Sequence, residues 1–209
     1  MSQYIGISAA DVEAMDLTDT LPFVAWHPDS KFFLADREHY RLLAYLARKV
    51  TALFPGSPVV DIGSHLGHSA AALRAGAAAA SVVHTFDHGV TKALPPDALA
   101  FARANGIVVN GPHADALDEL AKFVKGGCML VALDPEPHDG VYERKVIQAL
   151  MDCDFTGLLV LDETRLNEQM RHLLNWAPVK KIDVTSVAHW SGTAVLVFDP
   201  AKSLDCALI

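Results

Sequence analysis

The sequence predicts an α/β fold in which helices cover both faces of a mostly parallel, seven-stranded β-sheet with one antiparallel strand. Two observations carry this prediction. From residue 59 onward, short apolar runs alternate with helical patterns, as in a parallel sheet whose strands are buried on both faces. The last two predicted strands, 181–185 and 194–198, have no helix between them, which is typical of a closing antiparallel pair.

The predicted elements follow one another along the chain. Ser8 is the expected N-cap of a short helix, with Asp11 in its first turn. Residues 37–50 place apolar side chains at helical spacing between charged ones, which predicts an amphipathic helix. A strand then begins at Val59. Further helices are predicted over residues 66–75, 96–104, 115–124, 141–151 and 166–176, and further strands over 81–86, 107–109, 128–133 and 158–161.

Composition narrows the class of protein. The chain has 209 residues, of which 51% are hydrophobic, enough for one large domain with a buried core. Its net charge of −8 argues against a nucleic-acid partner, because the sequence offers no basic face. The first residues lack the pattern of a secretory leader, and no apolar run is long enough to span a membrane. Three cysteines without a CxxC pair fit reduced thiols, so we expect a cytoplasmic protein with no membrane partner.

The most informative stretch is residues 59–69. A buried strand runs into Asp61 and Gly63, a second glycine follows at Gly67, and an alanine-rich helix comes next. Glycines let the backbone approach a ligand closely, and the start of the helix offers unpaired backbone N–H groups. The stretch therefore predicts a site for a nucleotide-like cofactor.

Which cofactor binds depends on the glycine count and on the acids nearby. A dinucleotide site requires G-x-G-x-x-G after the first strand, whereas here Ser64 stands between Gly63 and Gly67 without the middle glycine. Asp61 would repel a pyrophosphate but suits a cofactor with a positively charged amino-acid end. Asp87 follows the next strand, where a carboxylate can accept hydrogen bonds from the ribose hydroxyls of either cofactor.

The pattern Asp61-x-Gly63-x-x-x-Gly67 resembles the first motif of class I methyltransferases that depend on S-adenosylmethionine (SAM). The resemblance covers residues 59–198, including the closing antiparallel pair, and implies the Rossmann-like fold of that class. We expect residues 1–55 to form a helical extension that caps the substrate and residues 56–209 to form the SAM-binding domain. The cofactor-binding residues that it implies are Asp61, Gly63, Ser64, Gly67, His68, Ser69, Asp87, His88, Asp115, Ala116 and Asp134.

A second group of acids ends two strands that we expect to be neighbours. Asp134 follows one strand, and Asp162 and Glu163 follow the other. Unpaired, three carboxylates would repel one another and raise at least one pKa. A hard divalent cation such as Mg²⁺ or Ca²⁺ would relieve this repulsion, since these ions prefer oxygen ligands. The alternative is a solvated strand end in which Asp162 or Thr164 caps the following helix.

These acids resemble the metal site of the catechol O-methyltransferase-like enzymes, and more closely that of the macrolide-sugar O-methyltransferases and cephalosporin hydroxylase-like proteins. The resemblance implies that Asp134, Asp162 and Glu163 bind the cation, with Mg²⁺ expected. Glu163 stands where the catechol enzymes have asparagine, and Pro137-His138 stands in place of their lysine base. The implied reaction is the methylation of a small-molecule hydroxyl, with His138 as the base and Asp134 at the reacting centre.

Other interpretations stay open at this point. An NAD(P)-linked oxidoreductase is disfavoured by the missing glycine and by Asp61, and a SAM- or nucleotide-binding accessory protein without catalysis would not need the second acid group. Residues 189–193 either line the substrate mouth, with Trp190 stacking on the substrate, or form a plain turn with Gly192 at positive φ and Trp190 packed on the edge. The apolar N-terminal residues permit a homodimer without requiring one.

Overall fold

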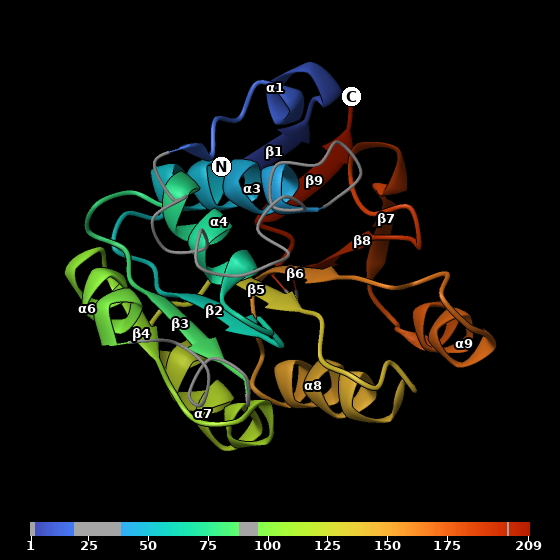
Figure 1. Ribbon diagram of the computed structural model, residues 1–209. Coiled ribbons are helices and arrows are strands. Elements are labelled where there is room, and N and C mark those ends of the chain that lie inside the picture. Colours follow the sequence, from blue (N-terminus) through green and yellow to red (C-terminus); the bar gives the residue numbers. More distant parts are fainter. Residues whose placement is uncertain (1–2, 19–38, 88–95, 200) are drawn as a thin grey trace.

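The computed structural model describes residues 3–18, 39–87, 96–199 and 201–209, and its main feature is a seven-stranded sheet (Figure 1). The strand order is β4-β3-β2-β5-β6-β8-β7. The strands span Val59–Ile62 (β2), Val83–Phe86 (β3), Ile107–Val109 (β4), Leu130–Leu133 (β5), Gly157–Leu161 (β6), Lys180–Asp183 (β7) and Ala194–Phe198 (β8).

One strand of this sheet runs against the others. β2 pairs in parallel with β3 and β5, β3 with β4, and β5 with β6. β8 lies between β6 and β7 and is antiparallel to both. β2, β5, β6 and β8 are buried at every residue, as expected for strands covered on both faces. The predicted mostly parallel sheet with one antiparallel strand is confirmed.

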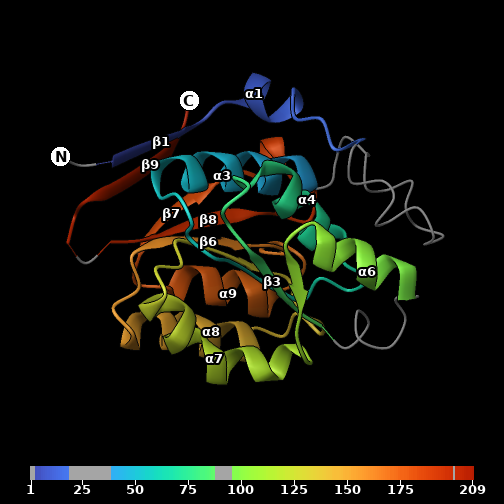
Figure 2. The same ribbon diagram turned by 90° about the vertical axis from the view of Figure 1, so that its left-hand side faces the viewer.

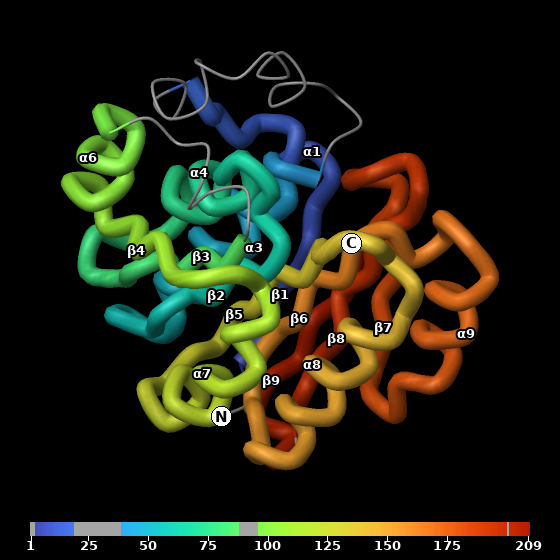
Figure 3. Tube along the Cα trace, turned by 60° about the horizontal axis from the view of Figure 1, so that its bottom comes forward, coloured from blue at the N-terminus to red at the C-terminus, as the bar shows by residue number. Residues whose placement is uncertain are grey.

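Helices cover both faces of the sheet. Figure 2 shows α3 and α4 on one side and α7, α8 and α9 on the other, and Figure 3 looks onto the second set. Each layer packs on its own hydrophobic cluster, so the sheet has a core on each face. The helices span Ala9–Glu13 (α1), Tyr40–Leu53 (α3), His68–Gly76 (α4), Pro96–Ala104 (α6), His113–Lys125 (α7), Val141–Asp152 (α8) and Glu168–Trp176 (α9).

The helix ends confirm one predicted cap and correct another. The Ser8 side chain accepts a hydrogen bond from the backbone N–H of Asp11 at 3.4 Å, as expected for an N-cap. α9 begins two residues later than predicted because its N-cap is Asn167, which accepts from the N–H of Met170 at 2.9 Å. Neither Asp162 nor Thr164 caps this helix. The interpretation of Asp162 as a helix cap is therefore excluded.

A second sheet, absent from the sequence prediction, joins the two ends of the described chain. β1 (Gln3–Ile7) and β9 (Leu204–Leu208) pair in parallel, in register from Gln3 and Leu204 to Ile7 and Leu208. The pair lies beside α3 on the α3/α4 side of the main sheet (Figures 1 and 2). Strands of five residues whose partner is about 200 positions away have no local signature, which is why periodicity missed them.

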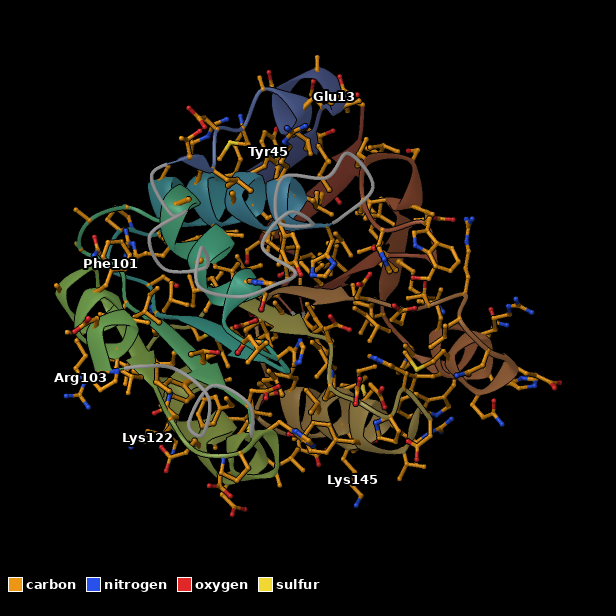
Figure 4. The ribbon with its side chains drawn as sticks, in the orientation of Figure 1. Glu13, Tyr45, Phe101, Arg103, Lys122 and Lys145 are labelled. Atoms are coloured by element: carbon orange, nitrogen blue, oxygen red, sulfur yellow. The ribbon has the colours of Figure 1, made fainter. Side chains whose placement is uncertain are left out.

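Residues of the predicted N-terminal cap take part in the core. The buried hydroxyl of Tyr45, on the side of α3 that faces β1 and α1 (Figure 4), donates a hydrogen bond to the carbonyl of Gly6 at 2.5 Å. By contrast, Lys122 and Lys145 lie on the outer sides of α7 and α8. Residues 19–38, the middle of the predicted cap, lie outside the described residues, so the division at residues 55 and 56 stays a prediction.

No helix within the described ranges combines the length and the hydropathy that crossing a membrane requires.

The terminal sheet leads to a prediction about stability. Ile7 is fully buried on β1, so replacing it with alanine should lower the free energy of unfolding by about 2–5 kcal/mol in urea titrations. Tyr4, on the same strand, is 54% exposed, and its replacement with alanine should cost no more than about 0.5 kcal/mol. Equal effects of the two substitutions would mean that β1 does not pack as described.

Candidate active site

The predicted site residues gather at one edge of the main sheet. The parallel strands β2, β3, β5 and β6 all end there, and the antiparallel strand β8 begins there, opposite Leu161 at the end of β6. Open α/β sheets bind ligands at this edge because the strands end in loops whose backbone groups are free of the ladder. The edge has two parts, a glycine loop after β2 and an acid cluster after β5 and β6.

Asp61 anchors the glycine loop from inside the sheet. Its carboxylate is 1% exposed, and Oδ2 accepts hydrogen bonds from the hydroxyls of Ser69 at 3.0 Å and Thr85 at 2.9 Å. Thr85 stands directly beside Asp61 in the register of β2 and β3, and its hydroxyl lies 2.7 Å from that of Ser64. Burial raises the pKa of Asp61 to about 7, although the two hydroxyls act in the opposite direction. The network ties together the strand, the loop and the start of α4.

Gly63 brings the loop against the end of β5. Its φ is +91°, and a Cβ atom there would lie 2.3 Å from the carbonyl oxygen of Asp134. Both facts require glycine, the first for backbone freedom and the second for space. The predicted glycine thus has a structural reason, because it sets the loop after β2 directly beside Asp134.

The rest of the loop presents the start of α4. Gly67, with φ +90°, is the N-cap residue, and His68 and Ser69 open the helix as buried residues. Asp87, at the end of β3, accepts a hydrogen bond from the backbone N–H of His65 at 2.9 Å. This hydrogen bond holds the Asp87 side chain against the loop. His88, also predicted to bind the cofactor, lies outside the described residues.

Asp115 and Ala116 lie in the first turn of α7 and differ in exposure. The Asp115 side chain is exposed and passes close to Gly111, whose carbonyl accepts the N–H of Asp87 at 3.1 Å. Asp115 therefore lies close to the loop that adjoins Asp87. Ala116 is fully buried and packs in the core, so its side chain is a structural one.

The acid cluster contains two histidines that the sequence prediction did not place in it. His39 Nδ1 lies 2.8 Å from Oδ2 of Asp162, and both side chains are buried. His189 Nδ1 lies 3.6 Å from the same oxygen and 3.3 Å from Oε1 of Glu163. The structure brings Asp134, Asp162 and Glu163 together as two overlapping groups whose ligand atoms lie within 4.8 Å of one another. These are His39, Asp134 and Asp162, and Asp162, Glu163 and His189.

The charges of the cluster are unequally balanced. Burial raises the pKa of Asp134 well above its usual range, and the carboxylate of Asp162 raises it further. Burial also raises the pKa of Asp162, but the imidazole of His39 and the hydroxyl of Thr193 outweigh it and hold the pKa below its usual value. The histidines thus supply part of the charge balance that the sequence argument had assigned to a cation alone.

Long-range contacts explain why sequence reasoning left out the histidines. His39 is the N-cap residue of α3, and its side chain reaches an acid 123 positions away on the chain. His189 sits in a turn that is hydrogen-bonded to the loop after β6, through Thr164 N–H to Gly192 O at 2.9 Å and Arg165 N–H to Ser191 O at 2.8 Å. The sequence held only one indication that these histidines could reach the site: His39 stands at the start of a helix, and His189 stands between the last two strands of the main sheet.

His138, the predicted base, stands at the edge of the cluster. Its Nδ1 lies 3.8 Å from Oδ1 of Asp134 and has no hydrogen-bond partner among the described residues, and its side chain is 16% exposed. Asn167, the N-cap of α9, donates from Nδ2 to the His138 carbonyl at 2.8 Å and so holds the loop. Nδ1 itself is buried and also lies 4.0 Å from Oε1 of Glu143, so the exposed surface of the side chain belongs to its other atoms.

The turn at residues 189–193 combines features of both interpretations. Gly192 has φ +101°, as a tight turn requires. Trp190, however, is 64% exposed, and its ring lies at a tilt to that of His189 with 5.5 Å between the ring centroids, so it is not packed on the sheet edge. An exposed indole next to the acid cluster leaves an aromatic surface at the mouth of the site.

A cavity of about 670 Å³ lies at the opposite edge of the sheet. Phe155, Lys180 and Phe198 are among the residues that line it. It contains none of the predicted site residues.

The raised pKa of Asp61 predicts a pH-dependent stability. Because the folded pKa of about 7 exceeds that of the unfolded chain, the folded protein binds more protons between pH 4 and 7 and loses stability as pH rises through that window. The loss amounts to about 1.4 kcal/mol for each unit of the shift. Asp61→Asn should remove it, so that unfolding free energies of parent and variant diverge from pH 4 to pH 7 in favour of the variant. Parallel curves would contradict the assignment.

Comparisons with known proteins bear on the fold. No protein-family model matches the sequence, and no curated protein matches it either. Among solved structures, a methyltransferase from Geobacter sulfurreducens is 19% identical, with a TM-score of 0.56 over 87% of this chain and 88% of that one. A Podospora anserina methyltransferase bound to S-adenosylhomocysteine (SAH) is 15% identical, with a TM-score of 0.56 over 88% and 87%. An O-methyltransferase from Bacillus cereus in complex with SAH is 13% identical, with a TM-score of 0.54 over 92% and 98%.

These similarities span most of each chain but rest on low identity, so they establish architecture and not chemistry. The mostly parallel seven-stranded sheet with one antiparallel strand accounts for the similarity in fold. The chain has the Rossmann-like fold of the class I methyltransferases.

Proposed function

We propose that the protein is a SAM-dependent methyltransferase that methylates a hydroxyl group of a small molecule with the help of a divalent cation. One observation carries the proposal. Gly63 packs the loop after β2 directly against the backbone of Asp134, so this loop and the partly buried acid cluster lie side by side. The similarity in fold to SAH-bound methyltransferases, one of them an O-methyltransferase, supports the proposal.

The first part of the edge would hold the cofactor. The backbone N–H groups of His68 and Ser69, in the first turn of α4, would favour a carboxylate of the cofactor, because a helix N-terminus carries partial positive charge. Asp87, tethered by the N–H of His65, would accept hydrogen bonds from the ribose hydroxyls. Asp61 and Ser64 support the loop through their hydrogen bonds with Ser69 and Thr85.

The second part of the edge fits a divalent cation. Asp134, Asp162 and Glu163 offer carboxylate oxygens, and Oε2 of Glu163 is a buried atom with no hydrogen-bond partner among the described residues. A buried, unpaired carboxylate oxygen is costly unless a ligand satisfies it. A bound cation would supply Lewis-acid chemistry that lowers the pKa of a substrate hydroxyl.

The chain's own residues would position the reactants and move the proton. His138 lies beside Asp134, and its imidazole, in the neutral form, would accept the proton of the substrate hydroxyl. Asn167 keeps His138 in place through the loop carbonyl. Trp190, exposed at the mouth, offers a flat surface for a ring or sugar face.

An NAD(P)-linked oxidoreductase is a poorer fit. The usual dinucleotide fold has the strand order 3-2-1-4-5-6, whereas here an antiparallel strand is inserted between the last two parallel ones. The loop after β2 also lacks the glycine that lets a backbone approach a pyrophosphate.

Cofactor choice can be tested by ligand-induced stabilisation. SAM and SAH should raise the melting temperature, and NAD⁺ and NADP⁺ should not, with or without Mg²⁺. Asp87→Ala should weaken SAH binding at least about tenfold, because two hydrogen bonds to a charged acceptor are lost. Asp118, exposed on α7, supplies the control variant Asp118→Ala, which should bind SAH like the parent. Stabilisation by NAD(P) alone would overturn the proposal.

The role of His138 can be tested separately from binding. With a hydroxyl acceptor found by screening with methyl-labelled SAM, His138→Gln should lower kcat by about 10²–10⁴-fold while leaving the SAH affinity unchanged. His172→Gln provides the control, because that side chain is 71% exposed on α9 and paired with Glu168. A kcat within threefold of the parent would assign the proton to another group.

A further inference from the structure

Glu143 is a buried acid that the proposed reaction does not yet use. It stands in the first turn of α8, and its side chain is 1% exposed. Neither of its carboxylate oxygens has a hydrogen-bond partner among the residues that the structure describes. Burial raises the pKa of Glu143, although nearby backbone N–H groups of Glu143 and Gly140 act in the opposite direction. A buried acid without a partner is costly, so packing alone does not account for it.

The imidazole of His138 lies next to this acid. Nδ1 of His138 is 4.0 Å from Oε1 of Glu143 and 3.8 Å from Oδ1 of Asp134. The two acids come from different elements, because Asp134 follows β5 and Glu143 lies on α8. Both separations are longer than a hydrogen bond, and such contacts often shorten when a substrate binds. Asp134 is also a proposed ligand of the cation, so Glu143 is the acid that remains for the ring.

We propose that Glu143 is a positioning residue for the methyl transfer: it holds the hydrogen of the neutral His138 ring on Nδ1, so that Nε2 accepts the proton of the substrate hydroxyl. The inference rests on the proposed function, because it assigns one atom to the base of that reaction. Glu143 acts only through the ring and touches neither the substrate nor the cofactor.

The two ring nitrogens differ in their surroundings. A neutral imidazole carries its hydrogen on one nitrogen and a lone pair on the other. A lone pair on Nδ1 would face the carboxylate of Glu143 and be repelled by it, whereas an N–H group there is attracted. Nδ1 is also buried, so a substrate does not reach it, and Nε2 is the only other ring nitrogen. Charge and access therefore select the same nitrogen as the proton acceptor.

The backbone fixes the ring beside the acid. His138 has φ +56°, a left-handed conformation that is uncommon for a residue with a side chain. Its carbonyl accepts a hydrogen bond from Nδ2 of Asn167 at 2.8 Å. Two residues later, Gly140 is the N-cap of α8, which sets Glu143 in the first turn next to the ring. Strained backbone of this kind is typical of residues with a functional role.

The charge of Glu143 matters most when the proton moves. The O–H bond of the substrate breaks as its proton passes to Nε2, and the oxygen electron pair forms the bond to the methyl carbon. The electron pair of the breaking bond between sulfur and that carbon stays on sulfur, which leaves SAH. The ring then carries a hydrogen on each nitrogen and a positive charge that Glu143 stabilises, before Nε2 releases the proton to water.

The tautomer of the ring tests the proposal on the unmodified protein. Long-range ¹H–¹⁵N NMR spectra of the full chain labelled with ¹⁵N-histidine, recorded where the ring is neutral, should show His138 with its hydrogen on Nδ1. Signals that disappear in His138→Gln assign the ring. In Glu143→Gln the shifts of the two nitrogens should move toward each other, because both tautomers become populated once the negative charge is removed.

Kinetics separate positioning from folding. With the acceptor found by screening, Glu143→Gln should lower kcat by about 10–100-fold and leave KM and the SAH affinity within about threefold of the parent. Glu143→Asp keeps the charge and should recover part of the loss. Glu168→Gln supplies the control, because that side chain is 82% exposed on α9, and it should match the parent in both kcat and ring tautomer.

Two outcomes would overturn the proposal. One is a parent ring with its hydrogen on Nε2, which would follow if a protonated Glu143 donated to Nδ1, and this measurement needs no variant of Glu143. The other is a Glu143→Gln ring with the tautomer of the parent. SAH binding is measured on the same sample. Its absence would count against the methyltransferase and leave the tautomer result standing, whereas SAH binding with the hydrogen on Nε2 would reject the role of Glu143 alone.

Discussion

The site depends on the contact between two strand-end loops. Gly63 lies so close to the backbone of Asp134 that no side chain fits between them, and this contact couples the loop after β2 to the loop after β5. The loop after β2, which is proposed to bind the cofactor, lies on one side of this contact. Asp162 and Glu163, which are proposed to bind the cation, lie on the other side. The distance between the two halves of the site is therefore set by backbone packing, which is stiffer than any side-chain arrangement.

The ionisable groups at the same edge of the sheet reduce the stability of the fold. Asp61 and Asp134 are held with raised pKa values by burial, and Asp162 with a lowered one by its imidazole and hydroxyl neighbours. Perturbed groups of opposite direction, packed next to one another, are typical of sites that handle charge or bind ions. A core built for stability alone would place apolar residues at these strand ends, because buried ion pairs seldom repay their desolvation.

The sequence predicted local structure better than it predicted meetings between distant residues. Strand and helix periodicity from Val59 to Phe198 was sufficient for the main sheet, its antiparallel strand and its strand-end acids, since each depends on a continuous pattern. It missed the β1–β9 pair, the Asn167 cap and the entry of His39 and His189 into the acid cluster. The role of a histidine at the start of a helix cannot be inferred from the local sequence, because the acid that pairs with it is distant along the chain.

The β1–β9 pair has a consequence for how the protein comes to be folded. Its two strands are the first and the last elements of the described chain, and so the pair closes only after everything between them has been synthesised. Closing so long a loop is slow compared with forming the local helices and hairpins. During synthesis on the ribosome, β1 therefore remains an unpaired edge until residues 204–208 have been made.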